Sequence, residues 1–221
     1  MPTPTPRAEL PPLHDDDVHL WWARTAPADD APGQRRPRLD RLLRRVLARY
    51  AGAAPDTLCF GREAQGRPFL LGSGMPEFNL SDTRGGSVIA VARRARIGVD
   101  LERLDRQLSH RRLAQRFFSA AEAAELDAMD DEAARAAFLR LWTAKEASCK
   151  ATGTGIAGWL AHWRFDPRPD PPQLVALPAE AGAASRWYHA RLSPDPDYTV
   201  VLACRDIRPT VWPLAFDPHA D

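Results

Sequence analysis

The chain has 221 residues, of which 44% are apolar and 27% are charged, and its formal net charge is +1. This composition is typical of a folded globular protein, and the near-neutral charge gives no reason to expect nucleic acid or a membrane as a partner. No apolar run approaches the ~20 residues that span a bilayer, and the Pro-rich start lacks the apolar stretch of a secretory signal. Three widely spaced cysteines, Cys59, Cys149 and Cys204, indicate a reducing, cytoplasmic location without disulfides.

The N-terminal part begins with a Pro-rich lead, residues 1–17, which we expect to be flexible. Alternating apolar residues predict a strand over 18–23, and apolar residues at helical spacing predict a helix over 38–50 that ends at Gly52. The other face of this helix is basic and almost free of acids. It includes Arg35, Arg36, Arg38, Arg41, Arg44, Arg45 and Arg49.

Short strands and then helices follow along the chain. The expected strands are 57–60, 69–71, 87–92 and 97–101, with a hairpin turn at Gly85-Gly86. The expected helices are 110–118, one opened by a capping box of Ser119 and Glu122, and a long helix over 131–152 ended by Gly153. Further β-like runs at 159–165, 173–177, 186–192 and 198–204 precede a Pro-broken tail.

This order lacks strict strand–helix–strand alternation, which favours an α+β protein over a doubly wound parallel sheet. We expect two subdomains of similar size, residues 18–97 and 98–221, that meet near residues 95–105.

The first motif that indicates chemistry covers residues 97–102. Side chains two apart in a strand lie on the same face, so Asp100 and Glu102 present two adjacent carboxylates. A hard divalent cation such as Mg²⁺, which prefers oxygen ligands, would offset their repulsion. The alternative is an exposed edge with two solvated acids.

The second motif lies in the long helix. Glu146 and Lys150 are four residues apart and share a face, so Glu146 could complete a metal site while Lys150 meets a phosphate. The alternative is a surface ion pair worth only ~0.3–0.5 kcal/mol. Lys145 and Lys150 are the only lysines in a chain with 30 basic residues, and lysine is a standard phosphate ligand.

Two weaker motifs are typical of turns, and the four motifs together resemble a known family. Asn79-Leu80-Ser81-Asp82 and Gly66-Arg67-Pro68 could both be plain turns. With the two motifs above, in this order, they resemble the 4′-phosphopantetheinyl transferase superfamily, specifically its surfactin-type (Sfp-like) branch. The family pattern runs Gly-Lys-Pro, Asn-Leu-Ser-His, Gly-Val/Ile-Asp-Leu/Ile-Glu and Trp-x-x-Lys-Glu-x-x-x-Lys, and the resemblance covers about residues 35–156.

The resemblance implies a two-lobed, pseudo-twofold α+β fold and a metal-dependent enzyme. Such an enzyme moves the phosphopantetheine arm of coenzyme A to a serine of an acyl or peptidyl carrier protein and releases 3′,5′-ADP. It implies Mg²⁺ (Mn²⁺ is possible) bound by Asp100, Glu102 and Glu146, with Asp100, Glu146 and Lys150 as catalytic residues. A cytoplasmic monomer is expected.

The resemblance also implies residues that bind coenzyme A. They are Arg35 or Arg36, Arg67, Ser81, Asp82, Lys145 and Lys150. Asp82 departs from the family, which has a histidine there, and an anion beside a phosphate is unfavourable unless a cation intervenes. Arg84 or Arg67 could supply that cation, Asp82 could turn away, or the transferase could be weakened.

Other functions have less support. Residues 153–158 fit the dinucleotide pattern G-x-G-x-x-G, but they follow a predicted helix rather than a strand. The cysteines and histidines lack the paired spacing of zinc ligands, and no G-x-S-x-G elbow of a hydrolase is present. The serious alternative is a homologue that binds coenzyme A or a carrier domain without turnover.

Overall fold

The computed structural model describes residues 10–31, 33–155 and 158–216. The strands are β1 (Asp17–Arg24), β2 (Phe60–Arg62), β3 (Pro68–Leu70), β4 (Glu77–Thr83), β5 (Gly86–Ala92), β6 (Ile97–Arg103), β7 (Arg164–Asp166), β8 (Gln173–Ala176), β9 (Trp187–Leu192), β10 (Tyr198–Arg205) and β11 (Thr210–Ala215). The α-helices are α1 (Arg35–Ala51), α2 (His110–Phe117), α3 (Ala120–Asp127) and α4 (Asp131–Thr152). Helices and strands do not alternate regularly, so the predicted α+β class is confirmed.

Two sheets form the centre of the molecule. The first has the strand order β11-β1-β5-β4 and the second has the order β6-β10-β9. β11 runs parallel to β1, whereas every other neighbouring pair in the two sheets is antiparallel. β4 and β5 form a hairpin in which Thr83 pairs with Gly86. The predicted hairpin is present, but its turn is Arg84-Gly85 rather than Gly85-Gly86, because Gly86 is already the first residue of β5.

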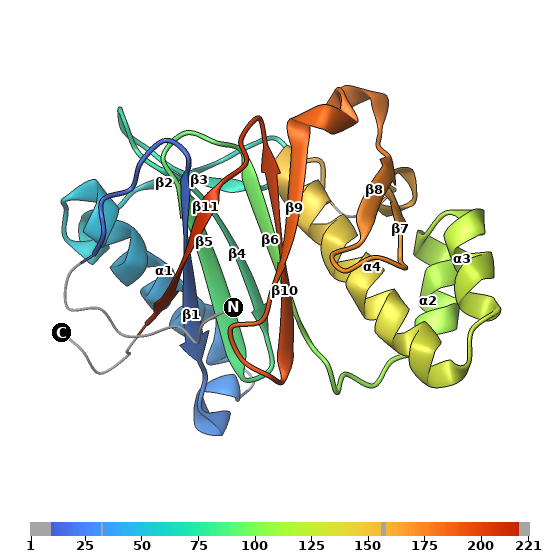
Figure 1. Cartoon of the computed structure of the whole chain (residues 1–221). Helices are drawn as coiled ribbons and strands as arrows, with labels where there is room; N and C mark the ends of the chain where they lie inside the picture. The colour runs from blue at the N-terminus through green and yellow to red at the C-terminus, as the bar shows by residue number, and fades with distance from the viewer. Residues whose placement is uncertain (1–9, 32, 156–157, 217–221) are drawn as a thin grey trace.

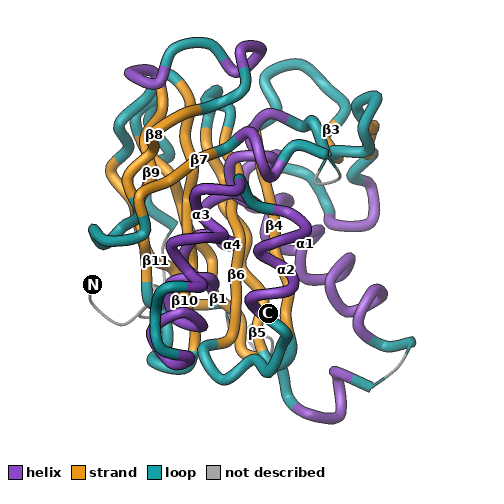
Figure 2. Tube along the Cα trace, turned by 90° about the vertical axis from the view of Figure 1, so that its right-hand side faces the viewer, coloured by secondary structure: helices purple, strands orange, loops and turns teal. Residues whose placement is uncertain are grey.

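Each sheet has a helical layer on its outer face, and the inner faces of the sheets pack on each other (Figure 1). α1 covers the first sheet, and α4 with α2 and α3 covers the second; Figure 2 shows the second helical layer from the front. Between α1 and the first sheet, Val46 of α1 and Val91 of β5 belong to one core. Val88 and Val99 belong to the core between the sheets, and Phe138 of α4 and Val201 of β10 belong to the core between α4 and the second sheet. We call each sheet with its helices a lobe. The division at residues 97 and 98 stays a prediction, and β11, near the end of the chain, pairs with β1 in the first sheet.

The lobes meet where β4 of the first sheet lies beside β6 of the second. The backbone N–H of Val99 donates a 2.9 Å hydrogen bond to Asn79 Oδ1 across this junction. Polar residues of β4 are therefore buried next to the acidic residues of β6. This burial explains why Asn79 and Ser81, expected in a turn, lie in a strand: their hydrogen-bond partners come from another strand rather than from a local turn.

Two other expectations differ from the structure. The tail contains a strand, β11, despite Pro213, because β11 is an edge strand and a proline is tolerated where one side needs no donor. The strand expected over 159–165 is reduced to β7, preceded by a short 3₁₀ turn, Leu160–His162. Within the described residues, no helix combines the length and apolar character needed to cross a bilayer.

Candidate active site

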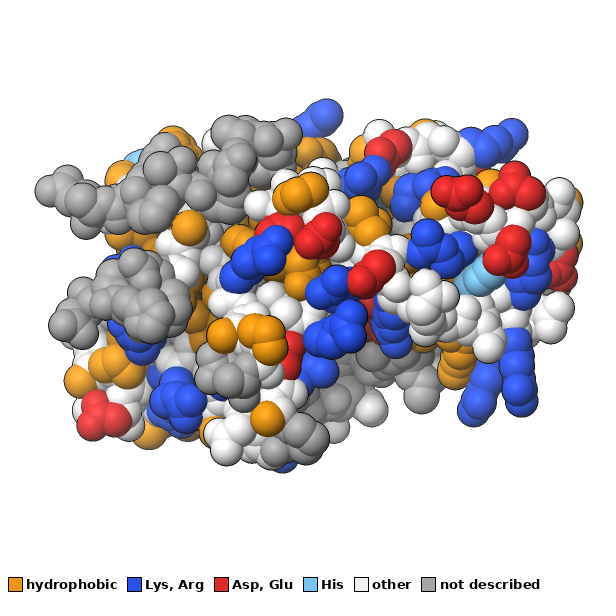
Figure 3. Space-filling view, turned by 90° about the horizontal axis from the view of Figure 1, so that it is seen from below, with side chains coloured by type: hydrophobic (Ala, Val, Ile, Leu, Met, Phe, Trp, Pro, Cys, Tyr) orange, Lys and Arg blue, Asp and Glu red, His pale blue; other side chains and the backbone are white. Residues whose placement is uncertain are grey.

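A cavity of about 750 Å³ lies where the lobes meet, a size typical of ligand pockets. Its walls come from the start of α1, from β4, from β6 and the segment after it, and from α4. Predicted site residues that line it are Arg35, Ser81, Asp82, Asp100, Glu102, Glu146 and Lys150. At the end of the molecule where the β4–β5 hairpin lies, basic and acidic side chains intermingle over the middle of the surface (Figure 3).

Gly98 determines how closely α4 approaches β6. A Cβ atom on Gly98 would lie 2.0 Å from the carbonyl oxygen of Ala147 and 2.4 Å from the backbone nitrogen of Ala151. Only glycine leaves room for the helix at this distance from the strand. Because strand residues alternate, Asp100 then points to the same side as Gly98, toward Glu146 and its neighbours on α4.

The acidic residues form a buried cluster around Lys150. Lys150 Nζ donates to Asp100 Oδ1 at 2.6 Å and lies 3.7 Å from Glu146 Oε2. Ser81 Oγ donates to the same Asp100 oxygen at 2.8 Å. Glu102, on the same strand face as Asp100, forms an ion pair with Arg106. Two acids predicted to converge with Glu146 therefore do lie in one pocket with it.

One oxygen of each acid on β6 has no hydrogen-bond partner. Asp100 Oδ2 and Glu102 Oε2 are buried and accept from no donor among the described residues. Buried carboxylate oxygens without donors are costly, and a hard cation with oxygen ligands would satisfy them. Within the described residues, no group of three His, Cys, Asp or Glu side chains is arranged to hold a metal ion. Asp100 is instead paired with Lys150, and Glu102 with Arg106.

The environment favours the protonated form of two of these acids. Burial and then the charge of Asp100 raise the pKa of Glu102 to about 7. Burial and the charge of Asp100 likewise raise the pKa of Glu146 to about 8. Burial opposes the charge of Lys150, but Asp100 and Glu146 outweigh it and raise the Lys150 pKa. Burial and mutual repulsion thus favour protonation of Glu102 and Glu146, whereas a bound cation would favour their ionised form.

Asp82 is paired with two arginines of α1. Arg35 donates through Nε to the Asp82 carboxylate and through Nη2 to its backbone oxygen at 2.6 Å. Arg38 Nη2 donates to Asp82 Oδ1 at 2.6 Å. The cation expected from Arg84 or Arg67 is thus supplied by Arg35 and Arg38 instead, because the first turn of α1 lies beside β4.

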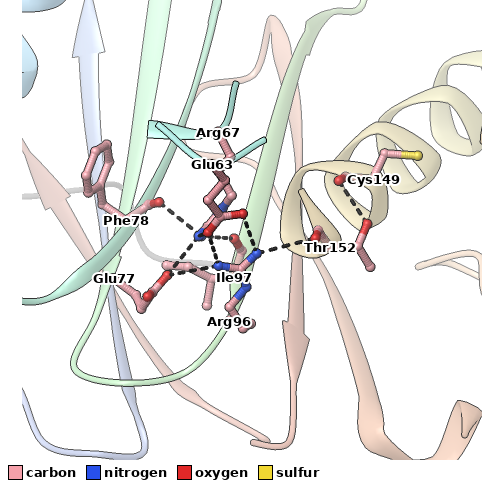
Figure 4. A network of polar contacts seen from close by, with 8 residues as sticks. All are labelled: Glu63, Arg67, Glu77, Phe78, Arg96, Ile97, Cys149 and Thr152. Atoms are coloured by element: carbon pink, nitrogen blue, oxygen red, sulfur yellow. Dashed lines mark hydrogen bonds and ion pairs between the residues drawn. The ribbon is translucent and has the colours of Figure 1, made fainter. Parts of the chain in front are cut away.

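The guanidinium of Arg67 is engaged in hydrogen bonds at the junction of the lobes. Its guanidinium donates to Glu77 Oε2 at 2.9 Å and to the backbone oxygens of Phe78 and Ile97 at 3.2 and 3.1 Å (Figure 4). Glu63 and Arg96 extend this network toward the end of α4. Arg67, expected to bind coenzyme A, therefore ties β3 to β4 and β6.

Lys145 lies outside the pocket and is fully buried. Its ammonium donates to Glu122 Oε2 at 2.8 Å and to the carbonyl oxygens of Leu160 and Trp163. Burial lowers the Lys145 pKa, although the charge of Glu122 acts in the opposite direction. Lys145, counted among the phosphate contacts on sequence grounds, does not reach the pocket and instead joins α4 to α3.

Arg36 is exposed and does not line the pocket, so Arg35 is the arginine at the start of α1 that reaches it. Two residues that pair with acids of the site were not among the predicted site residues: Arg38, which pairs with Asp82, and Arg106, which pairs with Glu102. The available signal was spacing: Arg38 lies one helical turn after Arg35, and Arg106 lies four residues after Glu102.

A smaller cavity of about 310 Å³ adjoins the first across Leu80 and Lys150. Gly66, Arg67 and Pro68 line it, so the Gly-Arg-Pro motif borders a cavity even though the Arg67 guanidinium is engaged. Gly153 ends α4 in the left-handed conformation, so the G-x-G-x-x-G match begins after a helix, and residues 156 and 157 lie outside the described part.

Comparison with known proteins identifies similar sequences. A profile of the 4′-phosphopantetheinyl transferase superfamily matches residues 96–203, which include β6 and α4. HetI, a 4′-phosphopantetheinyl transferase of Nostoc sp., is 34% identical over 178 residues, covering 77% of this chain and 71% of HetI. The transferase psf-1 of Bacillus pumilus is 31% identical over 165 residues, covering 74% of this chain and 68% of psf-1.

Other similarities are shorter or weaker. The chain matches only 49% of a relative from Synechocystis sp. and 51% of the 4′-phosphopantetheinyl transferase of Bacillus subtilis. The holo-[acyl-carrier-protein] synthase of Thermotoga maritima aligns with a TM-score of 0.37 and 20% identity over 52% of this chain and 66% of that one, too low to support a conclusion. The extent of the match to HetI and psf-1, together with the profile, shows that the chain belongs to the 4′-phosphopantetheinyl transferase superfamily.

Proposed function

We propose that the chain transfers the 4′-phosphopantetheine arm of coenzyme A to a serine of an acyl or peptidyl carrier protein, with Mg²⁺, and releases 3′,5′-ADP. The observation that carries this proposal is the convergence of Asp100, Glu102 and Glu146 in one pocket with Lys150 and Arg35. Acidic residues suit a metal, and basic residues suit the phosphates of coenzyme A. Family membership supports the same reaction.

The metal ligands would be Asp100, Glu102 and Glu146. Two of them have a buried oxygen without a donor, and all three are the hard oxygen ligands that Mg²⁺ prefers, as Mn²⁺ also does. Bound there, the cation would neutralise charge on the diphosphate of coenzyme A during transfer.

The side chains of α4 would handle the proton and the phosphate. The serine oxygen attacks the phosphorus next to the pantetheine arm, the phosphoanhydride bond breaks, and the electron pair leaves with 3′,5′-ADP. Glu146, in the ionised form that a bound cation would favour, would accept the serine proton directly or through one water, since it lines the pocket at the acidic cluster. Lys150 Nζ, which lines the cavity and contacts Asp100, would donate to an oxygen of the transferred phosphate.

The remaining assignments follow the layout of the pocket. Arg35 faces the pocket from the side opposite α4 and would meet the 3′-phosphate, and the mainly apolar cavity beside Gly66 and Pro68 would take the nucleotide base. We assign the chain to the surfactin-type branch because one chain contains both lobes. The alternative of a non-catalytic homologue was motivated by Asp82, and its pairing with Arg35 and Arg38 removes that reason.

The test is mass spectrometry of an apo carrier protein after incubation with this chain, coenzyme A and Mg²⁺. The wild type should add one phosphopantetheine, and a chelator should prevent the addition. Asp100→Ala or Glu146→Ala should lower the rate by at least about 10²-fold, the usual effect of removing an essential catalytic group. Asp40→Asn, which alters an exposed acid of α1 paired with Arg44, is the control and should label normally. Full labelling by Glu146→Ala would contradict the assigned roles.

A further inference from the structure

The wall of the pocket opposite α4 contains a compact group of charged residues, here called the Asp82 clamp: Asp82, Arg35, Arg38 and Ser87. Asp82 comes from β4, Ser87 from β5, and the arginines from the first turn of α1. The group therefore joins one helix end to a hairpin.

Both oxygens of Asp82 are used within the clamp. Oδ2 accepts from Arg35 Nε, and Oδ1 accepts from Arg38 Nη2 at 2.6 Å and from Ser87 Oγ. The Asp82 side chain is only 8% exposed. Asp82 thus presents no unpaired negative charge to the pocket, and the clamp as a whole has a charge of +1.

The two arginines have different positions in the clamp. Arg38 is mostly buried, bonds Ser87 Oγ at 2.9 Å and does not line the pocket. Arg35 lines the pocket, is 47% exposed, and has two of its nitrogens bonded to Asp82. No group of the described residues accepts from its third nitrogen, Nη1. The Nε and Nη2 atoms of Arg35 are therefore fixed by Asp82, while Nη1 is available to a ligand in the pocket.

We infer that Asp82 is a positioning residue that orients Arg35 to bind an anionic phosphate monoester of the substrate, with Arg38 compensating its charge. A guanidinium already fixed by two hydrogen bonds loses less side-chain entropy on binding than a mobile one. Its planar set of donors is then oriented to match the oxygens of a phosphate. Positive charge on this wall then comes from α1 rather than from the β4 residue itself. This inference rests on the proposed function, because coenzyme A supplies the phosphates.

The inference predicts an effect of Asp82 whose sign depends on Arg35. In the wild type, Asp82→Asn releases Arg35 and should weaken coenzyme A binding about tenfold, a factor that corresponds to about 1.4 kcal/mol. In an Arg35→Ala background, Asp82 has no guanidinium at position 35 to orient. The same Asp82→Asn change should then leave the affinity unchanged or increase it, since it removes a negative charge beside the pocket.

The experiment is calorimetric titration of coenzyme A, and of dephospho-coenzyme A, which lacks the 3′-phosphate, into the folded protein with Mg²⁺. We compare the single variants, the Asp82→Asn/Arg35→Ala double variant and Asp82→His, which replaces the carboxylate with an imidazole that is a cation when protonated. Asp82→His should recover part of the lost affinity, and the losses should be smaller for dephospho-coenzyme A. At saturating coenzyme A, kcat of Asp82→Asn should stay within about twofold, since a positioning residue acts on binding.

Two controls address charge and folding. Asp40→Asn and Arg41→Ala alter exposed charges on the same helix and should bind as the wild type does. If Asp82→Asn does not fold, Arg35→Lys serves instead, because lysine keeps the charge but cannot make the paired bonds to Asp82. It should weaken binding to a similar extent.

The outcomes separate this inference from the proposed function. Wild-type affinity in both Asp82→Asn and Arg35→Lys would overturn the clamp, and so would a full tenfold loss from Asp82→Asn on top of Arg35→Ala. A wild type that binds coenzyme A but labels no carrier would overturn only the proposed function. A wild type that binds no coenzyme A would overturn both.

Discussion

At the scale of single residues, the acidic cluster makes stability depend on pH. Glu102 and Glu146 have pKa values of about 7 and about 8 in the folded protein, above the ordinary value of 4.5. Between pH 4.5 and about pH 8, the folded state therefore binds more protons than the unfolded state. The free energy of unfolding falls as pH rises through this range. In a chelator, Tm should drop by several degrees between pH 5 and pH 8.5, since roughly 2–4 °C corresponds to 1 kcal/mol in a protein of this size.

Millimolar Mg²⁺ should reverse most of this loss at high pH, because a cation stabilises the ionised carboxylates. The measurement is thermal unfolding across pH with chelator and with Mg²⁺. Glu146→Gln removes one of the two titrating groups and should flatten the curve in chelator. A Tm that rises with pH in chelator, or a Mg²⁺ effect that is larger at pH 5 than at pH 8.5, would contradict the arrangement.

The sequence also shows where residue-level prediction stops. Periodicity could place Asp100 and Glu102 on one face of a strand, and Glu146 and Lys150 on one face of a helix. That Asp100 and Glu146 lie in one site was implied only by the family resemblance. The structural roles of Lys145 and Arg67 could not be predicted. Each cation is paired with a carboxylate, Glu122 for Lys145 and Glu77 for Arg67, and also donates to backbone carbonyl oxygens of distant segments. Spacing along the chain gives no information about such partners.

At the scale of elements, the contact of α4 with β6 depends on Gly98. In Gly98→Ala the added methyl group would meet the Ala147 carbonyl at 2.0 Å, so the helix must move away from the strand. Overpacking of this kind costs about 1–3 kcal/mol or more. Because Glu146 and Lys150 lie on the displaced helix, the Mg²⁺-induced rise in Tm should be reduced as well. Wild-type Tm together with wild-type labelling of a carrier would refute this account of the glycine.

Element prediction succeeded where periodicity is strong and failed where tertiary contacts decide. The 22-residue helix α4 begins at Asp131 and ends at Thr152, as expected, because its cap and its terminal glycine are local signals. β4 contains residues typical of turns and could not be recognised, since its polar side chains are satisfied by β6. β11 contains a proline and is stabilised as a strand only by its place beside β1.

At the scale of the whole molecule, the site exists only because two lobes meet. Arg35 and Ser81 come from the first lobe, and Asp100 and Lys150 come from the second. The three carboxylates of the acidic cluster all come from the second lobe, whereas Arg35 comes from the first. The contacts that fix one lobe on the other should therefore affect stability and binding together.

Asn79 is the most direct test of this coupling. Its Oδ1 accepts the Val99 N–H across the junction at 2.9 Å, and its side chain is buried. Asn79→Ala leaves that backbone donor without an acceptor, which should lower the free energy of unfolding by about 1–3 kcal/mol. Chemical denaturation measures the loss, with Arg41→Ala as the control for an exposed position. Because Val99 precedes Asp100, the affinity for Mg²⁺ should fall in parallel, and an unchanged midpoint with unchanged Mg²⁺ affinity would show that the junction does not organise the site.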